Sequence, residues 1–167
     1  MTAAERVTAL ENPATRLQHA LDLAFRSLNR RELTVLELRR VLEAKRVEPA
    51  TIEEVITELR GQGYLDDARF ATRFAEDKRH LEQWGADRIE RRLLARGIDP
   101  DTARGALAGC DRASELDGAL ALLRRRFPRP PSDSKAWRSA YGVLVRKGFD
   151  PELAGDALRA YGHESAI

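Results

Sequence analysis

The chain has few of the residues on which enzyme chemistry and metal binding usually depend. Its 167 residues include one cysteine and three histidines, and they show no Gly-rich phosphate loop, nucleophile motif or catalytic triad pattern. The lone Cys110 excludes an intrachain disulfide, as suits a reducing compartment. The histidines lack the spacing of metal ligands; they are His19, His80 and His163. We therefore expect no enzyme, no cofactor and no metal site.

Long apolar runs are missing as well. No uninterrupted run approaches the about 18 residues that a membrane-spanning helix needs, and no basic-then-apolar segment opens the chain. Alternating strand patterns are absent. We expect a cytoplasmic, soluble monomer with no membrane partner, and a flexible lead-in over residues 1–13.

Lysine is scarce although charge is plentiful. The 29 basic residues oppose 27 acidic ones, and all but Lys45, Lys78, Lys135 and Lys147 are arginines. Charged residues make up 34% of the chain, above the usual level of about a quarter. Arginine binds phosphate and carboxylate through two parallel hydrogen bonds. A GC-rich coding sequence would produce the same excess, so composition alone leaves both explanations open.

A repeated pattern organises the rest of the sequence. A tripeptide of an apolar residue, an acid and proline recurs every 51 residues, as Val47-Glu48-Pro49, Ile98-Asp99-Pro100 and Phe149-Asp150-Pro151. The same interval separates Leu42, Leu93 and Leu144. Such a period indicates stacked units that bury their apolar faces against each other. The sequence predicts an all-α fold, an elongated array of three tandem three-helix repeats over residues 14–62, 63–111 and 112–167.

Helix start and stop signals agree with nine helices in these repeats. Thr34 followed by Glu37 forms a capping box, and Asp99 followed by proline is an N-cap with proline at the first helical position. Gly97 is placed to end a helix in the left-handed conformation. Three prolines make the loop 128–133 a stiff linker.

Several residues have both a chemical and a structural interpretation. Asp66 and the adjacent aspartate could hold a metal, but Asp66 stands where a helix needs an N-cap. Cys110 ends an apolar stripe and is expected in the core. Trp84 is expected to pack on Ile89, with base stacking by Trp84 or Trp137 as the weaker alternative.

Basic residues concentrate in two places. At 100° per residue, four arginines of the helix over residues 86–96 fall in one broad sector: Arg88, Arg91, Arg92 and Arg96. This stripe suits phosphates or an acidic partner, or it is a solvated face neutralised by neighbouring acids such as Asp87. A second cluster precedes the proline-rich loop and consists of Arg124, Arg125, Arg126 and Arg129.

The segment 88–107 also resembles a helix-turn-helix, because its turn over residues 97–100 has a suitable length. The same turn recurs at 148–151 and nearly at 46–49, which favours repeat architecture. An autonomous DNA-binding protein remains the alternative.

Nine consecutive residues, Gly63-Tyr64-Leu65-Asp66-Asp67-Ala68-Arg69-Phe70-Ala71, resemble the central motif of the RecX family of recombination regulators. Arg79, Gly85, Arg88-Ile89 and Gly97-Ile98 continue that pattern. The resemblance extends over residues 16–161, with residues 34–45 similar to the first unit and Arg146-Lys147-Gly148-Phe149 similar to the last. Arg46 departs from it, because the family often has glycine there.

This resemblance implies a modulator, usually inhibitory, of the RecA recombinase in recombinational DNA repair. Such proteins bind the RecA–single-stranded-DNA filament in its helical groove and suppress ATP hydrolysis and strand exchange, and some also touch DNA. The resemblance carries over the basic residues Arg69, Arg79 and Arg88. Helical geometry adds the remaining candidates: Arg73, Arg91, Arg92, Arg96, Arg124, Arg125 and Arg126.

Overall fold

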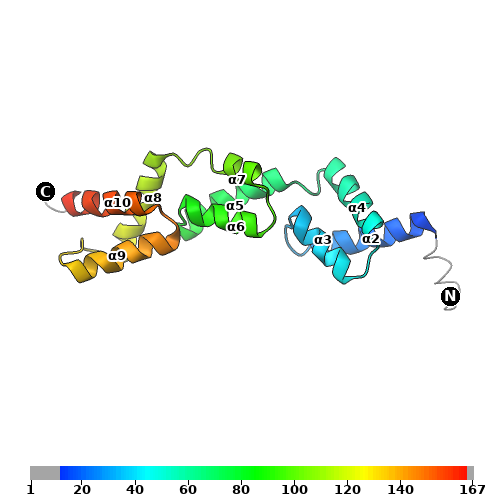
Figure 1. The fold of residues 1–167 in the computed structure, drawn as a ribbon, viewed down its shortest axis with the longest axis horizontal. Coiled ribbons are helices and arrows are strands. Elements are labelled where there is room, and N and C mark those ends of the chain that lie inside the picture. Colours follow the sequence, from blue (N-terminus) through cyan, green and yellow to red (C-terminus); the bar gives the residue numbers. More distant parts are fainter. Residues whose placement is uncertain (1–11, 165–167) are drawn as a thin grey trace. The chain divides into compact units, whose positions relative to one another are not determined.

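The computed structural model describes residues 12–164, and within them it contains helices and no strands. The helices are labelled in Figure 1. They are α2 (Pro13–Leu28), α3 (Val35–Ala44), α4 (Pro49–Gly61), α5 (Asp67–Glu82), α6 (Ala86–Ala95), α7 (Pro100–Ala106), α8 (Arg112–Arg126), α9 (Ser134–Lys147) and α10 (Pro151–Glu164). The expected all-α fold with nine helices is confirmed over this range. None of these helices is both long and apolar enough to cross a membrane.

The expected lead-in lies almost entirely outside the described residues. Its last position belongs to α2, because Pro13 is the first helical residue and Asn12 is the N-cap. The side chain of Asn12 accepts a hydrogen bond from the N–H of Ala14 at 2.9 Å. The helix therefore begins slightly earlier than the sequence predicted.

Contacts divide the chain into two compact units. The first contains the residues up to Phe70 together with Arg96–Ile98, and the second contains Ala71–Ala95 together with the residues from Asp99 onward. The division into three repeats with the predicted boundaries stays a prediction.

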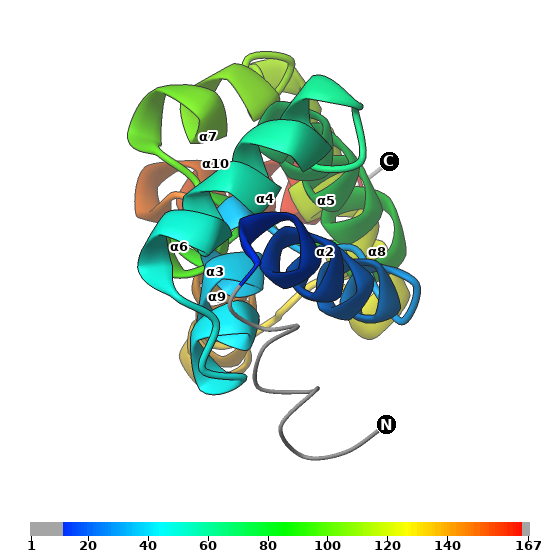
Figure 2. The same ribbon diagram turned by 90° about the vertical axis from the view of Figure 1, so that its right-hand side faces the viewer.

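In the first unit, α2, α3 and α4 pack against one another around a leucine-rich core (Figure 2). Leu38, Leu42 and Leu59 are fully buried there. The expected capping box starts α3: Thr34 Oγ1 accepts from the N–H of Glu37, and a carboxylate oxygen of Glu37 accepts from the N–H of Thr34. The cap fixes where α3 begins, and thereby which of its faces reaches the core.

In the second unit, α8 packs mainly on α10, and α9 contacts both (Figure 1). Their shared core includes the fully buried Leu122, Leu123 and Leu144. Ile89 and Leu93 give α6 an apolar face that is also fully buried. The leucines spaced by 51 residues, at positions 42, 93 and 144, all occupy core positions, as the repeat predicted.

The turns after the second helix of each repeat share a left-handed residue. Gly97 has φ +84° and Gly148 has φ +93°. Arg46, which replaces a glycine of the family pattern, has φ +61°. A non-glycine residue pays about 1–2 kcal/mol in this region, and the helix still stops there. The arginine at position 46 therefore makes the turn less favourable in free energy but does not change its backbone conformation.

Two other local expectations have different outcomes. Asp66 is an N-cap as expected, because its Oδ1 accepts from the N–H of Arg69 at 2.9 Å. Among the described residues no group of three or more His, Cys, Asp or Glu could hold a metal. Cys110 is only half-buried and lies beyond the end of α7, so its expected place in the core is wrong. Burial raises the pKa of its thiol, which leaves it protonated and unreactive at neutral pH.

Candidate functional site

In the first unit, the turn at Gly97 packs on the start of α3. The hydroxyl of Thr34 donates to the carbonyl oxygen of Arg96 at 2.7 Å. A Cβ placed on Gly97 would lie only 2.4 Å from the Leu36 side chain, so only glycine allows this approach. We call this contact the first junction.

An ion pair closes the first junction. Arg96 donates from Nε and Nη2 to the two carboxylate oxygens of Glu37, both at 2.8 Å. The guanidinium also lies 4.3 Å from the centre of the Phe70 ring. Burial alone would raise the pKa of Glu37, but hydrogen bonds from Arg96 and Thr34 and the nearby positive charges hold the pKa below its usual value.

A similar close approach occurs 51 residues later, within the second unit, with a backbone N–H as the donor in place of the Thr34 hydroxyl. The N–H of Gly85 donates to the carbonyl oxygen of Lys147 at 2.8 Å, and the N–H of Asp87 donates to that of Gly148 at 3.2 Å. A Cβ on Gly148 would lie 2.2 Å from the Cβ of Arg88. We call this contact the second junction.

The two junctions differ in charge. The position of Glu37 in the first is taken by Arg88 in the second, and that of Arg96 is taken by Lys147. The attractive pair at the first junction is thus replaced by two cations. Like charges near each other repel, and an anion bound between them relieves the repulsion.

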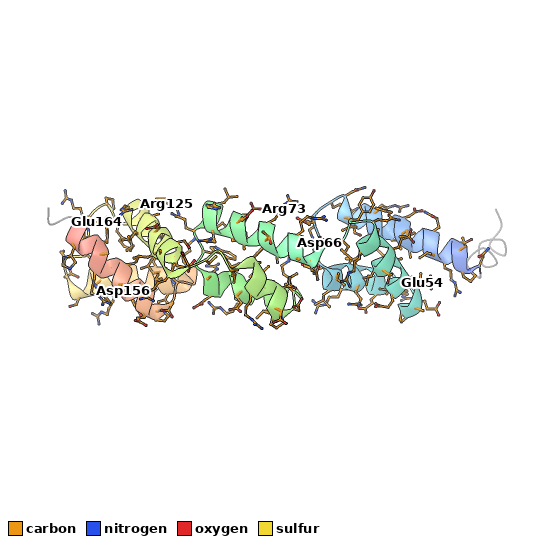
Figure 3. The ribbon with its side chains drawn as sticks, turned by 90° about the horizontal axis from the view of Figure 1, so that it is seen from above. Glu54, Asp66, Arg73, Arg125, Asp156 and Glu164 are labelled. Carbon is orange, nitrogen blue, oxygen red and sulfur yellow. The ribbon has the colours of Figure 1, made fainter. Side chains whose placement is uncertain are left out.

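Further arginines increase the positive charge at the second junction. Burial lowers the pKa of Lys147, and the charges of Arg88, Arg125 and Arg126 lower it further, while Glu82 opposes them. We define the second-junction basic cluster as Arg88, Arg125, Arg126 and Lys147. Arg125 lies on the exposed surface of α8, where Figure 3 labels it. Three elements, α6, α8 and the end of α9, therefore bring positive charge to one place.

Two cations of this cluster, Lys147 and Arg88, are held by uncharged groups. Lys147 Nζ donates to the carbonyl oxygen of Glu82 at 2.8 Å, and Arg88 Nη1 donates to that of Arg146 at 3.1 Å. The Arg88 guanidinium also lies 4.0 Å from the centre of the Trp84 ring. The carboxylate of Glu82 is already paired with Lys78. Carbonyls and an aromatic ring orient the cations, and Glu82 offsets only part of their charge, so the cluster keeps a positive excess that suits an anion.

The predicted arginine stripe on α6 does not form a single free surface. Arg96 lies beyond Ala95, the last residue of α6, and is held by Glu37 at the first junction. Arg88 is held at the second junction. Arg91 and Arg92 are exposed on α6, and Arg91 Nε donates to the carbonyl oxygen of Asp87 at 3.2 Å. Helix periodicity groups these arginines in one sector but does not show which of them other elements engage.

The other predicted arginines have varied surroundings. Arg79 is half-buried and donates to Ser114 Oγ at 3.1 Å, so it holds α5 to the start of α8. Arg69 donates to the carbonyl oxygen of Gly63 at 2.8 Å. Arg73 is exposed on α5 (Figure 3). Arg124 binds both carboxylate oxygens of Glu164, which holds α8 to the end of α10. Among the predicted arginines, Arg88, Arg125 and Arg126 all act on the charge of Lys147. Arg91 and Arg92 follow Arg88 by three and four residues on the same face of α6.

Lys147 is the member of the cluster that sequence reasoning missed as a site residue. Its signal was present in the 51-residue interval, which aligns position 37 with 88 and position 96 with 147. Comparing charge at equivalent repeat positions would have found the reversal.

Two family models match the chain. Residues 20–59 match the first three-helix domain of RecX, and residues 66–107 match the second.

Curated proteins and solved structures are similar over most of the chain. The regulatory protein RecX of Leptothrix cholodnii is 34% identical over 141 residues, covering 84% of this chain and 88% of that protein. The regulatory protein RecX of Xanthomonas campestris is 36% identical over 146 residues, covering 87% and 84%. The crystal structure of RecX from Lactobacillus salivarius superposes with a TM-score of 0.80 and 19% identity, covering 89% of this chain and 97% of that one. At that identity the structural match establishes the fold alone.

Proposed function

Because this chain belongs to the RecX family of regulatory proteins, we propose that it binds the RecA–single-stranded-DNA filament and inhibits its ATP hydrolysis and strand exchange. The second-junction basic cluster is the docking surface. In this way the protein modulates recombinational DNA repair.

The observation that supports the docking surface is the charge reversal between the two junctions. Arg88 and Lys147 stand where Glu37 and Arg96 form an ion pair. A nucleoprotein filament is rich in phosphates and carboxylates, and an anionic group of either kind relieves the repulsion among the four cations.

The alternative, an autonomous helix-turn-helix protein, is less well supported. Its recognition helix would be α7, which has 7 residues. The N-terminal residues of a recognition helix face base edges and phosphates, but here they include Asp99, the N-cap, and Asp101. Two carboxylates at that end would repel DNA.

The test is the substitution Arg88→Glu, which copies the first junction into the second. The new carboxylate stands at the third helical position after Gly85, where an acid suits the helix dipole, and opposite Lys147. We expect the fold to keep its stability while the cluster loses two units of positive charge. Inhibition of RecA-dependent ATP hydrolysis should weaken by at least about tenfold at low salt, and the difference should shrink as salt rises.

The matched control is Arg40→Glu, which makes the same charge change at an exposed position of α3. It should inhibit like the parent chain. Co-sedimentation with single-stranded DNA, with and without RecA and a non-hydrolysed nucleotide, separates filament binding from autonomous DNA binding. A folded Arg88→Glu chain that inhibits as well as the Arg40→Glu chain would rule out the cluster as the docking surface.

A further inference from the structure

A cavity of about 310 Å³ lies within the first unit, between α2, the turn after α3 and the first turn of α4. This volume is at the lower end of the range for small-ligand pockets. The cavity is lined by three cations, Arg16, Lys45 and Arg46, and by one acid, Glu48. His19 on the same wall adds a further nitrogen donor. The positive excess favours an anionic ligand.

The one acid of the cavity is already paired, whereas two of the cations are not. Arg16 Nη1 donates to a carboxylate oxygen of Glu48 at 2.9 Å. Lys45 and Arg46 are exposed, and neither side chain forms an ion pair or a hydrogen bond with another described residue. Two positive charges therefore remain available to a ligand.

Arg46 stands beside this cavity in an unfavourable backbone conformation. Its φ is +61°, whereas the equivalent positions of the 51-residue interval are glycines, Gly97 and Gly148. Glycine adopts this conformation without the steric cost of a Cβ. Strained residues of this kind cluster at binding and catalytic sites. An arginine at this position therefore indicates a role beyond the turn, which a glycine would form more readily.

The first turn of α4 leaves open the donors that the matching turn of α7 uses internally. In α7, the side chain of Asp99 accepts hydrogen bonds from both the N–H and the hydroxyl of Thr102. The equivalent residues in α4 are Glu48 and Thr51, but the side chain of Glu48 makes no capping hydrogen bond. The N–H and the hydroxyl of Thr51 therefore lack the acceptor that Thr102 has.

The Thr51 hydroxyl is a polar group without a partner at this cavity. The residue is 8% exposed, and it lines the cavity. Its hydroxyl makes no hydrogen bond to another described residue. The hydroxyl is also not one of the atoms that are both fully buried and unpartnered, so it keeps accessible surface on the side of the cavity. Since nearly buried polar groups are normally hydrogen-bonded, this one points to a ligand that accepts its hydrogen bond.

We propose that this cavity binds a phosphate group, with Thr51, Lys45 and Arg46 as its donors. Thr51 stands in the first turn of a helix, where the helix dipole favours an anion. Arg46 can bind two phosphate oxygens through parallel hydrogen bonds, and Lys45 adds a second charge. The phosphate is carried either by a small ligand or by the backbone of a nucleic acid. The site belongs to the first unit, and it goes beyond the docking proposed at the second junction.

The probe is inorganic phosphate, added to the full-length chain labelled with ¹⁵N. Sodium chloride at equal ionic strength is the control for screening. We expect the amide signal of Thr51 to shift saturably, with a Kd of roughly millimolar size. The amide of Thr102 is the internal control, because it stands at the equivalent helix position but already donates to Asp99 at 2.9 Å. Its signal should stay in place.

Two sets of variants test the donors. Thr51→Val removes the hydroxyl and should weaken phosphate binding by about threefold or more, whereas Thr51→Ser keeps the hydroxyl and should bind like the parent chain. Arg46→Gly removes a charge and relieves the strain at φ +61°. It should weaken binding by about fivefold or more while raising the unfolding midpoint. Arg40→Gln removes a charge from an exposed position of α3 outside the cavity and should leave binding unchanged.

A single-stranded dT oligonucleotide without terminal phosphates identifies the source of the group. A Thr51 shift with this probe assigns the phosphate to a nucleic-acid backbone, and a shift with inorganic phosphate alone assigns it to a small ligand. Either result supports the site. Absence of a saturable shift with both probes, with inorganic phosphate raised to about 50 mM, well above a millimolar Kd, would overturn it.

Unchanged binding after Arg46→Gly or after Thr51→Val would overturn the phosphate site as well. Such a failure would leave the proposed docking at the second junction untouched, because that cluster is tested by Arg88→Glu.

Discussion

Replacing Glu37 by alanine tests how much the first junction contributes to stability. Three groups would lose an interaction. Arg96 loses the two hydrogen bonds to Glu37 at 2.8 Å, and Arg31 loses its ion pair with Glu37 at 3.2 Å. The N–H of Thr34 loses the capping-box acceptor at 3.1 Å.

The burial of the Arg96–Glu37 ion pair determines how much unfolding free energy is lost. The side chains of Arg96 and Glu37 are 22% and 17% exposed, so the pair is neither a surface contact nor fully buried. Breaking a fully buried pair costs about 3–5 kcal/mol, whereas an exposed pair contributes about 1 kcal/mol or less. Losing the cap adds about 0.5–1 kcal/mol. We expect Glu37→Ala to lower the free energy of unfolding by about 2–4 kcal/mol.

The chain provides a matched control with similar geometry and less burial. Arg39 binds both oxygens of Glu53 at 3.0 and 3.1 Å, but these side chains are 33% and 60% exposed. Glu53→Ala should therefore cost only about 0.5 kcal/mol. Urea unfolding followed by circular dichroism gives both values from the midpoint and the slope. Equal losses in the two variants would refute the argument from burial.

The pH dependence gives an independent check on the same residue. The pKa of Glu37 is lower in the folded chain than its usual value. Its contribution is therefore complete above the unfolded pKa of about 4.3 and is lost as pH falls through the lower folded value. The stability difference between the parent chain and Glu37→Ala should shrink as the solution is acidified through that window. A constant difference down to about pH 2, well below the unfolded value, would contradict the ion-pair account.

Two further predictions use unfolding midpoints. Leu93→Ala should lower the free energy of unfolding by roughly 2–5 kcal/mol, because Leu93 is 0% exposed. Arg92→Ala should change it little. Comparable losses in the two variants would mean that the repeat register of α6 is wrong. Gly148→Ala should cost about 3 kcal/mol or more, since its Cβ would lie 2.2 Å from the Cβ of Arg88 at φ +93°. Gly105→Ala should raise the free energy of unfolding by about 0.5–1 kcal/mol, because alanine favours the helix and nothing lies within 4 Å of the added atom. If both glycine variants changed stability in the same direction, that result would be evidence against the close approach at Gly148.

Most of the helical framework followed from local signals in the sequence. The Thr34–Glu37 capping box, the Asp99 cap and the left-handed Gly97 depend on residues within a few positions of each other, so local chemistry suffices to predict them. The buried leucines followed from the 51-residue interval, because equivalent positions in stacked units face the same core. Cys110 was misplaced because α7 ends at Ala106 and the apolar stripe continues beyond the helix.

The surface was harder to predict than the core. Arg79, Arg96 and Arg124 looked like free cations, yet their partners are Ser114, Glu37 and Glu164, which lie 35 to 59 residues away in sequence. Helical periodicity defines a face but does not reveal what packs on it. The 51-residue interval carried the charge reversal of the candidate site, but the partners of these three arginines became visible only in the structure.

Comparing the two junctions shows which features of the turn are shared, namely the left-handed glycine, and which differ, namely the charge at positions 37 and 88. Both need a glycine, because a Cβ would lie too close to the helix on which each turn packs, α3 at Gly97 and α6 at Gly148. The hydrogen bonds to the carbonyls of Arg96 and Lys147 do not involve the side chains at positions 37 and 88, and so the charge there can differ. The oppositely charged pair at the first junction contributes to stability. At the second junction, burial and then the charges of Arg88, Arg125 and Arg126 lower the pKa of Lys147. An anion bound there would raise that pKa toward its usual value, since it favours the charged ammonium. Arg88→Glu should therefore weaken docking at the second junction while the fold keeps its stability.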